Sequence, residues 1–418
     1  MDKFIVKGGT SLKGKVKISG AKNSALALIV AAALADGECI LQNVPRESDV
    51  ETICEILRKL GVQIWFSEDG TLHVQGDKLS SYEAPYDLVR KMRASFYVAG
   101  LLLARLGKAE VPLPGGCSLG SRPVDFHIKG FQTLGAAVSI EHGLMKASTP
   151  RLVGARFYVD RASVGTTINM MLAASLAQGT TFLENAAKEP EVVDLAVFLN
   201  AMGAKIRGAG TNVIKIDGVE RLQAVEYSII PDRIEAATFM VAAAITRGEL
   251  IIEDVVPEHL RSVILKLQEA GIKVEEGVTS VLVTAGQRPR SVDVETAPYP
   301  GFPTDVQQPF VALMSVAEGT SVVRETIFDR FRYVDELRRM GADIRVERDT
   351  AIIRGVPKLT GAPVEATDLR AGAALLLAGL AAEGTTELIG VEHIDRGYER
   401  LDQKLVAVRA SLRRVSIS

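Results

Sequence analysis

The chain has 418 residues, of which 47% are apolar and 24% are charged, and its formal net charge at pH 7 is −2. This length exceeds the size at which a single hydrophobic core usually stops growing, so two domains are expected. The balanced charge gives no electrostatic reason to expect nucleic acid or an anionic membrane as a partner, and an anionic ligand must be bound by local basic residues.

Three cysteines, Cys39, Cys54 and Cys117, are too few and too scattered for a disulfide framework, and no Cys/His cluster has the spacing of a zinc site. We therefore expect no metal ion and a reducing compartment. The N-terminal segment lacks the apolar region of a signal peptide, and no stretch of about 18 residues is free of polar breaks. The sequence thus predicts a cytoplasmic protein that does not bind membranes.

An internal repeat of roughly 70 residues runs along the chain. Helices rich in Ala, Leu and Val begin near residues 20, 92, 163, 232, 304 and 368, and their lack of a polar stripe predicts that they are buried. Each is followed by a glycine, where a left-handed helix cap is expected, and by a short strand. These glycines are Gly37, Gly107, Gly179, Gly248, Gly319 and Gly384.

Each unit continues into an amphipathic helix that ends on a shared phrase, such as LGV or MGA, and the sixth unit lacks the closing glycine. Strand-like runs, among them GKVKIS, ARFYVD, VEYSII and SVDVET, precede the buried helices. Units of this βαβ type predict an α/β protein with two domains of three units each.

The unit count sets the expected domain boundaries. Units one to three define an N-terminal domain of residues 22–229, and units four to six define a C-terminal domain of residues 230–418. The strand KFIVKGG at the N-terminus needs a sheet, and the sixth unit has no successor to supply its last strand. We therefore expect residues 1–21 to complete the C-terminal domain, with the chain crossing near Gly20–Ala21 and near Ile230–Pro231.

Charged residues interrupt the repeat at the starts of helices that are otherwise apolar. A helix N-terminus attracts anions through its unpaired N–H groups, and a basic side chain there adds a full charge. The residues concerned are Lys22, Arg93, Asp305 and Arg370, and Arg122, Arg330 and Arg396 stand near the starts of amphipathic helices. A single such residue is more often a solvated lysine or a surface ion pair, but together they predict anion binding by both domains.

The stretch PGGCSLGSRPVD places Cys117 in an open loop between glycines and prolines. It superficially matches a P-loop, but Arg122 and Pro123 replace the Lys-Ser/Thr pair, so we discount that motif. Cys39 and Cys54 lie among aliphatic residues, as buried structural cysteines do, so Cys117 is predicted to be the functional thiol. The histidines form no convincing catalytic pair and are expected at ordinary polar positions; they are His73, His127, His142, His259 and His393.

A set of motifs in a fixed order resembles the UDP-N-acetylglucosamine 1-carboxyvinyltransferases, a branch of the enolpyruvyl transferases. The resemblance extends from residue 1 to about residue 405, and its motifs are SGAKNSAL, MRAS, PGGCSLGSRPVD, SVGTT, ENAAKEPE, PDRIE, GFPTD and HIDRGYERL. It implies a two-domain inside-out α/β barrel like that of EPSP synthase. It also implies transfer of the enolpyruvyl group of phosphoenolpyruvate to the 3-hydroxyl of UDP-N-acetylglucosamine with release of phosphate, the first committed step of peptidoglycan synthesis, without a cofactor, a metal or an obligatory protein partner.

The resemblance also implies roles for individual residues. The implied catalytic residues are Cys117, Asp305 and Lys22. Cys117 would donate a proton to phosphoenolpyruvate and would be alkylated by the epoxide fosfomycin, and Asp305 would act as the base. The implied contacts to phosphoenolpyruvate are Lys22, Asn23, Arg122, Arg396, Arg330 and Arg370. Those to UDP-N-acetylglucosamine are Asn23, Arg93, Arg122, Pro123, Val124, Asp125, Phe126, Arg161, Ala162, Ser163, Val164, Asp305 and Ile327. Arg161 stands where a lysine is frequent, which keeps the charge but alters the donor geometry.

Three alternatives stay open at this point. The sister reaction on shikimate 3-phosphate would use the same fold, although the cysteine loop argues against it. The chain could be the principal or the secondary copy in an organism with two. A catalytically silent relative would keep the repeat and lose the charged residues, yet Lys22, Cys117, Arg122, Asp305 and Arg396 are all present.

Overall fold

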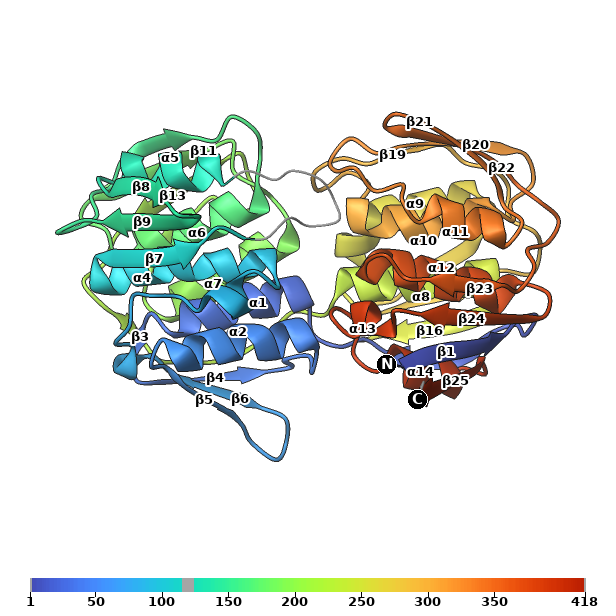
Figure 1. Ribbon diagram of the computed structural model, residues 1–418, viewed down its shortest axis with the longest axis horizontal. Helices are drawn as coiled ribbons and strands as arrows, with labels where there is room; N and C mark the ends of the chain where they lie inside the picture. Colours follow the sequence, from blue (N-terminus) through green and yellow to red (C-terminus); the bar gives the residue numbers. More distant parts are fainter. Residues whose placement is uncertain (1, 115–123, 417–418) are drawn as a thin grey trace. The chain divides into compact units, whose positions relative to one another are not determined.

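The computed structural model describes residues 2–114 and 124–416 (Figure 1). The chain divides into two compact units at Ser19/Gly20 and at Ile230/Pro231. The N-terminal unit begins at Gly20 and ends at Ile230, and the C-terminal unit combines the residues up to Ser19 with those from Pro231 onward. Each unit has a hydrophobic core of its own.

The core of the N-terminal unit is built on helices that are buried on nearly all sides, as the repeat predicts. These are α1 (Lys22–Ala32), α4 (Val98–Leu106) and α6 (Val164–Ser175). Around them lie α2 (Ser48–Lys59), α3 (Tyr86–Val89), α5 (Asp125–Thr133) and α7 (Pro190–Ala201), with the 3-10 helices η1 (Gly76–Lys78) and η2 (Arg93–Tyr97).

Sheets cover these helices. One has the order β15-β4-β6-β5, with β15 (Glu226–Ser228), β4 (Glu38–Gln42), β6 (Leu72–Gln75) and β5 (Gln63–Phe66). A second has the order β10-β11-β13-β12, with β10 (Arg156–Tyr158), β11 (Thr180–Glu184), β13 (Val213–Asp217) and β12 (Lys205–Arg207). The others are β7-β9-β8, with β7 (Lys108–Pro112), β9 (Leu144–Ser148) and β8 (Ala137–Glu141), and the pair β14 (Leu222–Gln223) and β3 (Ala35–Asp36).

The C-terminal unit repeats this arrangement. Its buried helices are α8 (Arg233–Ile245), α10 (Thr304–Met314) and α12 (Leu369–Ala381). The more exposed helices are α9 (Arg261–Glu269), α11 (Val334–Arg339), α13 (Val391–Ile394) and α14 (Leu401–Ala407), with η3 (Pro257–Leu260) before α9.

Its sheets have the orders β17-β18-β16-β2, β19-β20-β22-β21 and β23-β24-β1-β25. The strands are β1 (Asp2–Lys7), β2 (Lys13–Lys17), β16 (Glu249–Glu253), β17 (Lys273–Glu276), β18 (Ser280–Thr284), β19 (Val294–Glu295), β20 (Thr320–Arg324), β21 (Asp343–Glu347), β22 (Thr350–Arg354), β23 (Pro363–Glu365), β24 (Thr385–Ile389) and β25 (Ser411–Ser416). In strands such as β20 and β22 every second residue is buried, because alternate side chains point toward the helices.

The N-terminal strand β1 occupies the place in the last sheet that β22 occupies in the sheet before it. It pairs antiparallel with β24, Phe4 opposite Leu388, and with β25, Ile5 opposite Arg413. Figure 1 shows this strand, blue in the sequence colours, between the red strands of the chain's end. The first residues of the chain thus supply the strand that the sixth unit lacks.

The strands beside the two crossings do not stay with the helices that follow them. β2, which precedes α1 in the sequence, pairs in parallel with β16 of the C-terminal unit, Val16 opposite Ile252. β15, which precedes α8, pairs in parallel with β4 of the N-terminal unit, Tyr227 opposite Leu41. At both places the chain enters the other unit between the strand and the helix that follows it.

Five of the six glycines after the buried helices have the left-handed φ that the sequence predicts; the exception is Gly248. Only Gly107, among those named, is the left-handed C-cap residue itself, with φ 64° after α4. In the fourth unit the left-handed residue is Arg247, with φ 51°. Gly248 is required there for another reason, since a Cβ atom would lie 2.2 Å from the carbonyl oxygen of Leu12.

Within the described ranges, no helix combines the length and apolar composition needed to cross a lipid bilayer.

Candidate active site

The N-terminal unit holds Lys22 in a buried position. Lys22 is the first residue of α1 and is 6% exposed, and its Nζ lies 3.5 Å from Oδ2 of Asp49, which is in the first turn of α2. The alternative of a solvated lysine near a helix cap is therefore wrong. Removing an ammonium group from water is costly unless a carboxylate compensates it, and Asp49 does so here.

The segments expected to bind the sugar nucleotide meet at one buried amide, that of Asn169 in α6. Its Nδ2 donates to the carbonyl oxygen of Phe96 at 3.0 Å and to Nδ1 of His127 at 2.9 Å. Its Oδ1 accepts from the backbone N–H of Gly100 at 2.9 Å. Asn169 therefore joins η2 and α4, the helix α5, which begins at Asp125, and α6, whose N-cap is Ser163.

His127 is the histidine that the sequence analysis misjudged. It is buried, its ring meets that of Phe96 edge to face at 5.1 Å, and burial together with the nearby charge of Arg93 lowers its pKa to about 3. Its ring is therefore neutral, and because Nδ1 accepts from Asn169 the proton resides on Nε2. The spacing to Phe131 and Leu134, on the same face of an amphipathic helix, is the sequence signal that could have revealed the burial.

The remaining predicted residues of this unit occupy the starts of helices. Arg93 opens η2, Val124 precedes α5, and Asp125 and Phe126 are its first residues. Arg161 and Ala162 precede Ser163, whose Oγ accepts from the N–H of Thr166 at 3.3 Å. Asn23 is the second residue of α1 and is half-buried. Cys117, Arg122 and Pro123 lie outside the described residues.

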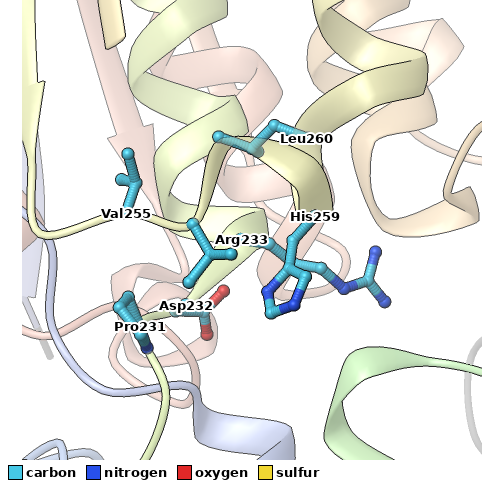
Figure 2. A pocket seen from close by; sticks show the side chains of 7 residues that line it. Pro231, Asp232, Arg233, Val255, His259 and Leu260 are labelled. Atoms are coloured by element: carbon cyan, nitrogen blue, oxygen red, sulfur yellow. The ribbon is translucent and has the colours of Figure 1, made fainter. Parts of the chain in front are cut away.

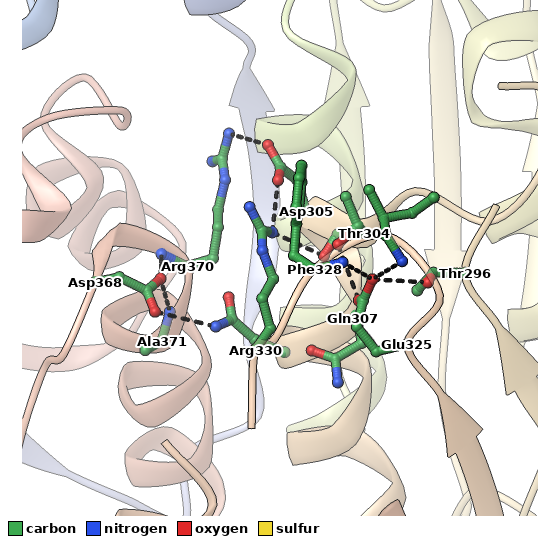
Figure 3. Close-up of polar contacts among 12 residues, drawn as sticks. Thr296, Thr304, Asp305, Gln307, Glu325, Phe328, Arg330, Asp368, Arg370 and Ala371 are labelled. Atoms are coloured by element: carbon green, nitrogen blue, oxygen red, sulfur yellow. Dashed lines mark hydrogen bonds and ion pairs between the residues drawn. The ribbon is translucent and has the colours of Figure 1, made fainter. Parts of the chain in front are cut away.

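In the C-terminal unit, Asp305 stands between two buried arginines (Figure 3). Asp305 is the second residue of α10; its Oδ1 lies 2.6 Å from Nη1 of Arg330 and its Oδ2 lies 3.2 Å from Nη2 of Arg370. The Nη1 of Arg330 also donates to the carbonyl oxygen of Thr304 at 3.0 Å. The structure thus brings together three residues that are far apart in the sequence.

The two guanidinium groups have donors to spare. Arg330 and Arg370 are 6% and 2% exposed, yet Nε of Arg330 and both Nε and Nη1 of Arg370 have no hydrogen-bond partner among the described residues. Buried N–H groups without an acceptor are costly, so this arrangement favours an incoming anion. A single carboxylate also leaves one net positive charge on the cluster.

Asp368 holds α12 beside α10. Its Oδ1 accepts from the N–H groups of Arg370 and Ala371 at 2.9 and 3.0 Å, which caps α12, and its Oδ2 accepts from Nε2 of Gln308 at 3.2 Å. This contact between the two helices sets the position of Arg370 relative to Asp305.

Two further predicted residues of this unit, Ile327 and Arg396, lie in loops. Ile327 lies in the loop between β20 and α11, where its N–H donates to Oε1 of Glu325 at 2.9 Å. Arg396 lies half-buried between α13 and α14.

A small depression lies at the amino end of α8 (Figure 2). Its lining includes Asp232, Arg233 and His259, and Asp232 caps α8 by accepting from the N–H groups of Ile234 and Glu235 at 2.7 and 3.0 Å. The sequence analysis used PDRIE as a motif but named none of these residues as a site. Asp before a buried apolar helix was the available signal.

Cys39 and Cys54 are buried and unbonded, and burial raises the pKa of both thiols, that of Cys54 to about 12. They are therefore poor nucleophiles. No group of three or more His, Cys, Asp or Glu side chains that could hold a metal ion occurs in the described part of the chain.

Comparison with known proteins gives the family. The family model of EPSP synthase (3-phosphoshikimate 1-carboxyvinyltransferase) matches residues 6–405. The chain belongs to the EPSP synthase family. Among members of this family, "UDP-N-acetylglucosamine 1-carboxyvinyltransferase 2" of Symbiobacterium thermophilum is 59% identical over 416 residues, which cover 99% of this chain and 98% of that protein. "UDP-N-acetylglucosamine 1-carboxyvinyltransferase" of Halothermothrix orenii is 51% identical, with 99% and 100% covered.

Solved structures of the EPSP synthase family agree with the fold. The enolpyruvyl transferase NikO from Streptomyces tendae superposes with a TM-score of 0.91 at 27% identity, covering 100% of this chain and 99% of that one. An EPSP synthase from Acinetobacter baumannii, at 22% identity and a TM-score of 0.76 over the whole of both chains, shows the fold alone. The fold class expected from the repeat and the family resemblance drawn from the motifs are both confirmed.

Proposed function

We propose that this protein transfers the enolpyruvyl group of phosphoenolpyruvate to the 3-hydroxyl of UDP-N-acetylglucosamine and releases phosphate, a step of peptidoglycan synthesis. The observation that carries the choice of acceptor is the 59% identity, over nearly the full length of both chains, to a relative named for this reaction. Both substrates are charged metabolites that do not cross membranes unaided, so we place the reaction in the cytoplasm.

The chemistry requires an acid and a base. In the addition step the sugar oxygen bonds to C2 of the enolpyruvyl group, its proton goes to a base, and an acid protonates the methylene carbon. In the elimination step the C2–O bond to phosphate breaks, the methyl group loses a proton, and inorganic phosphate leaves. We assign the acid to Cys117 and the base to Asp305.

The Asp305 cluster supports this assignment from the C-terminal unit. Phosphoenolpyruvate carries a carboxylate and a phosphate, and Arg330 and Arg370 retain buried N–H donors without partners among the described residues. A carboxylate ligand that engages these donors would compete with Asp305 for the two guanidinium groups. Asp305 would then be released to accept a proton from the sugar hydroxyl. We assign Lys22, Asn23, Arg122 and Arg396 to the same substrate.

The N-terminal unit supports binding of the sugar nucleotide. Segments 93–97, 124–127 and 161–169 converge on Asn169, so their positions are set together. A diphosphate suits the helix starts at which Arg93, Asp125 and Ser163 lie, because the first N–H groups of a helix favour anions. We assign this ligand to Asn23, Arg93, residues 122–126 and 161–164, Asp305 and Ile327.

The decisive experiment measures phosphate release from phosphoenolpyruvate with UDP-N-acetylglucosamine and, in parallel, with shikimate 3-phosphate. Release only with the sugar nucleotide is expected. Shikimate 3-phosphate is the second candidate acceptor because the family model is named for that reaction. Release only with this acceptor would replace the proposal, and release with neither would favour a non-catalytic relative.

Cys117 offers a separate test of the acid. Cys117→Ser is expected to slow turnover by at least about 100-fold, because a hydroxyl is a much weaker acid than a thiol, while the melting temperature stays unchanged. Fosfomycin is expected to add one covalent adduct, which peptide mapping would place on Cys117. Modification of Cys39 or Cys54 instead, or near-normal turnover of the variant, would contradict the assignment.

A further inference from the structure

A buried carboxylate outside the predicted set, that of Glu325, lies directly behind the Asp305 cluster. Glu325 follows β20 in the C-terminal unit and is 2% exposed. Glu325 forms no ion pair with another described residue. Its negative charge is therefore compensated by hydrogen bonds. Figure 3 shows its side chain reaching between the start of α10 and the loop that leads to Arg330.

Four donors converge on this carboxylate. Oε1 accepts from Oγ1 of Thr296 at 2.9 Å and from the N–H groups of Ile327 and Phe328 at 2.9 and 3.1 Å. Oε2 accepts from Oγ1 of Thr304 at 2.9 Å. Each carboxylate oxygen has about two lone-pair positions, so the three donors fully occupy Oε1, while Oε2 serves Thr304.

The four donors come from three segments around the site. Thr304 is the first residue of α10 and immediately precedes Asp305. Ile327 and Phe328 belong to the loop that ends at Arg330. Thr296 follows β19 and also receives the N–H of Thr326 at 2.9 Å, which fastens the same loop to the sheet.

The start of α10 depends on this contact. The N-cap position of α10 is Pro303, and no side-chain hydrogen bond caps the helix. The Glu325–Thr304 bond is therefore a fixed point for the turn that carries Asp305, while the bonds to Ile327 and Phe328 fix the loop that carries Arg330. Glu325 therefore fixes both Asp305 and Arg330, whose side chains lie 2.6 Å apart, relative to each other.

We propose that Glu325 is a positioning residue for the enolpyruvyl transfer, holding the first turn of α10 and the 326–330 loop so that Asp305 and Arg330 meet the substrates in a fixed geometry. The inference rests on the proposed function. It goes beyond it because Glu325 touches neither Asp305 nor Arg330 directly and acts through the backbone of each. Misplacement by about 1 Å of a catalytic group can cost roughly 100-fold in rate.

The competing explanation is that Glu325 only stabilises the sheet. A matched control is Ser321→Ala, which removes another buried bond of the same strand, from the N–H of Val292 to Oγ of Ser321 at 3.0 Å, away from Asp305. The loss of one buried hydrogen bond typically lowers the free energy of unfolding by about 1 kcal/mol. We expect Ser321→Ala to lower the melting temperature and to leave kcat within about threefold.

Three variants then isolate the role of Glu325. Glu325→Gln keeps the oxygen that serves Thr296, Ile327 and Phe328 and turns an amide N–H toward the Thr304 hydroxyl, which can accept it, so turnover within about threefold of wild type is expected. Glu325→Asp is one methylene too short to reach all four donors, and kcat is expected to fall roughly 100-fold. Thr304→Val removes only the bond to α10, and kcat is expected to fall about tenfold with little change in KM, as for an interaction made in the transition state.

Steady-state kinetics at a temperature where all variants are folded, together with melting curves, decide the matter. Loss of kcat in Glu325→Asp and Thr304→Val, with near-normal Glu325→Gln and Ser321→Ala, supports the inference. Melting temperatures that fall while kcat stays within threefold in all four variants overturn it and leave the proposed function intact. An inactive wild-type protein, measured first, would overturn both.

Discussion

The two units organise their charged residues by different means. In the C-terminal unit, a half-buried carboxylate touches two buried guanidinium groups directly: Asp305 lies between Arg330 and Arg370, with Asp368 and Glu325 behind them. In the N-terminal unit, apart from the buried Lys22–Asp49 ion pair, a neutral amide, Asn169, and a neutral imidazole, His127, connect the segments that carry the charged residues.

The charged cluster and the neutral network suit different roles in the proposed reaction. A charged cluster in a low-dielectric environment responds strongly when one charge is added or removed, which suits a site where a proton moves and an anion binds. A neutral network keeps its geometry over a wide pH range, which suits a scaffold for a ligand that is bound but not transformed. The following predictions separate these two roles.

The largest effect is expected at Asp305. Asp305→Ala removes the proposed base and leaves two buried guanidinium groups without their carboxylate, so we expect activity to fall at least about 1,000-fold and the unfolding free energy to fall by about 3–5 kcal/mol. Stopped phosphate-release assays and urea unfolding measure the two. Asp305→Asn, which keeps the shape, is the control: retention of more than a tenth of the activity would contradict the role as base.

The neutral network should respond differently. Asn169→Leu leaves the N–H of Gly100 and the carbonyl of Phe96 unpaired in the core, so we expect a loss of about 2–4 kcal/mol in unfolding free energy. Because the segments that it joins are assigned to the sugar nucleotide, KM for UDP-N-acetylglucosamine should rise while kcat changes little. Equal losses in kcat for Asn169→Leu and Asp305→Ala would break the contrast between the units.

His127 makes the contrast depend on pH. Its pKa is about 3 in the folded protein and near 6.5 in an unfolded chain, so below pH 6.5 the unfolded state binds the extra proton. The stabilisation is complete above pH 6.5 and is lost progressively toward pH 3, with about 2 kcal/mol lost at pH 5. Urea unfolding of wild type and His127→Gln between pH 7.5 and 5 should show a shallower dependence in the variant. Parallel curves would mean that His127 is not buried in its neutral form.

Much of this architecture can be predicted from the sequence, because it depends on local hydrophobic patterns and on the internal repeat. Helices that are apolar all round, such as α1 and α12, can only be buried, and the count of units shows that the strand at the N-terminus must complete the last sheet. The sequence analysis assigned Asp305, Arg330 and Arg370 to one anion-binding site, but it did not predict that Asp305 pairs with both arginines. Their meeting depends on contacts across 25 and 65 positions, which no local pattern reports.

Asn169 and Glu325 were missed for a related reason. A single polar residue in an apolar helix, or a glutamate after a strand, has no distinctive spacing, and its role exists only through partners such as Phe96 or Thr304 that the fold brings near.

The smallest effect concerns the turn that closes the sixth unit. Gly341 follows α11 and has φ 89°. The N–H of Gly341 donates to the carbonyl oxygen of Arg338, and the N–H of Ala342 donates to that of Leu337, which is the pattern of a Schellman cap. Arg409 occupies the same position after α14, with φ 79°. Its N–H donates to the carbonyl oxygen of Val406, and the N–H of Ala410 donates to that of Leu405. The sixth unit, which lacks the glycine, therefore keeps the left-handed backbone conformation at Arg409, where a residue with a Cβ atom is strained.

Arg409→Gly should relieve that strain and stabilise the C-terminal unit by about 1 kcal/mol, with catalysis unchanged. Gly341→Ala, where the added Cβ has room but the backbone is left-handed, is the matched variant and should destabilise by a similar amount. Differential scanning calorimetry compares both with wild type. If Arg409→Gly lowers the melting temperature, the arginine side chain contributes more by its surface contacts than its backbone conformation costs, and the sixth unit has replaced its glycine for a reason other than drift.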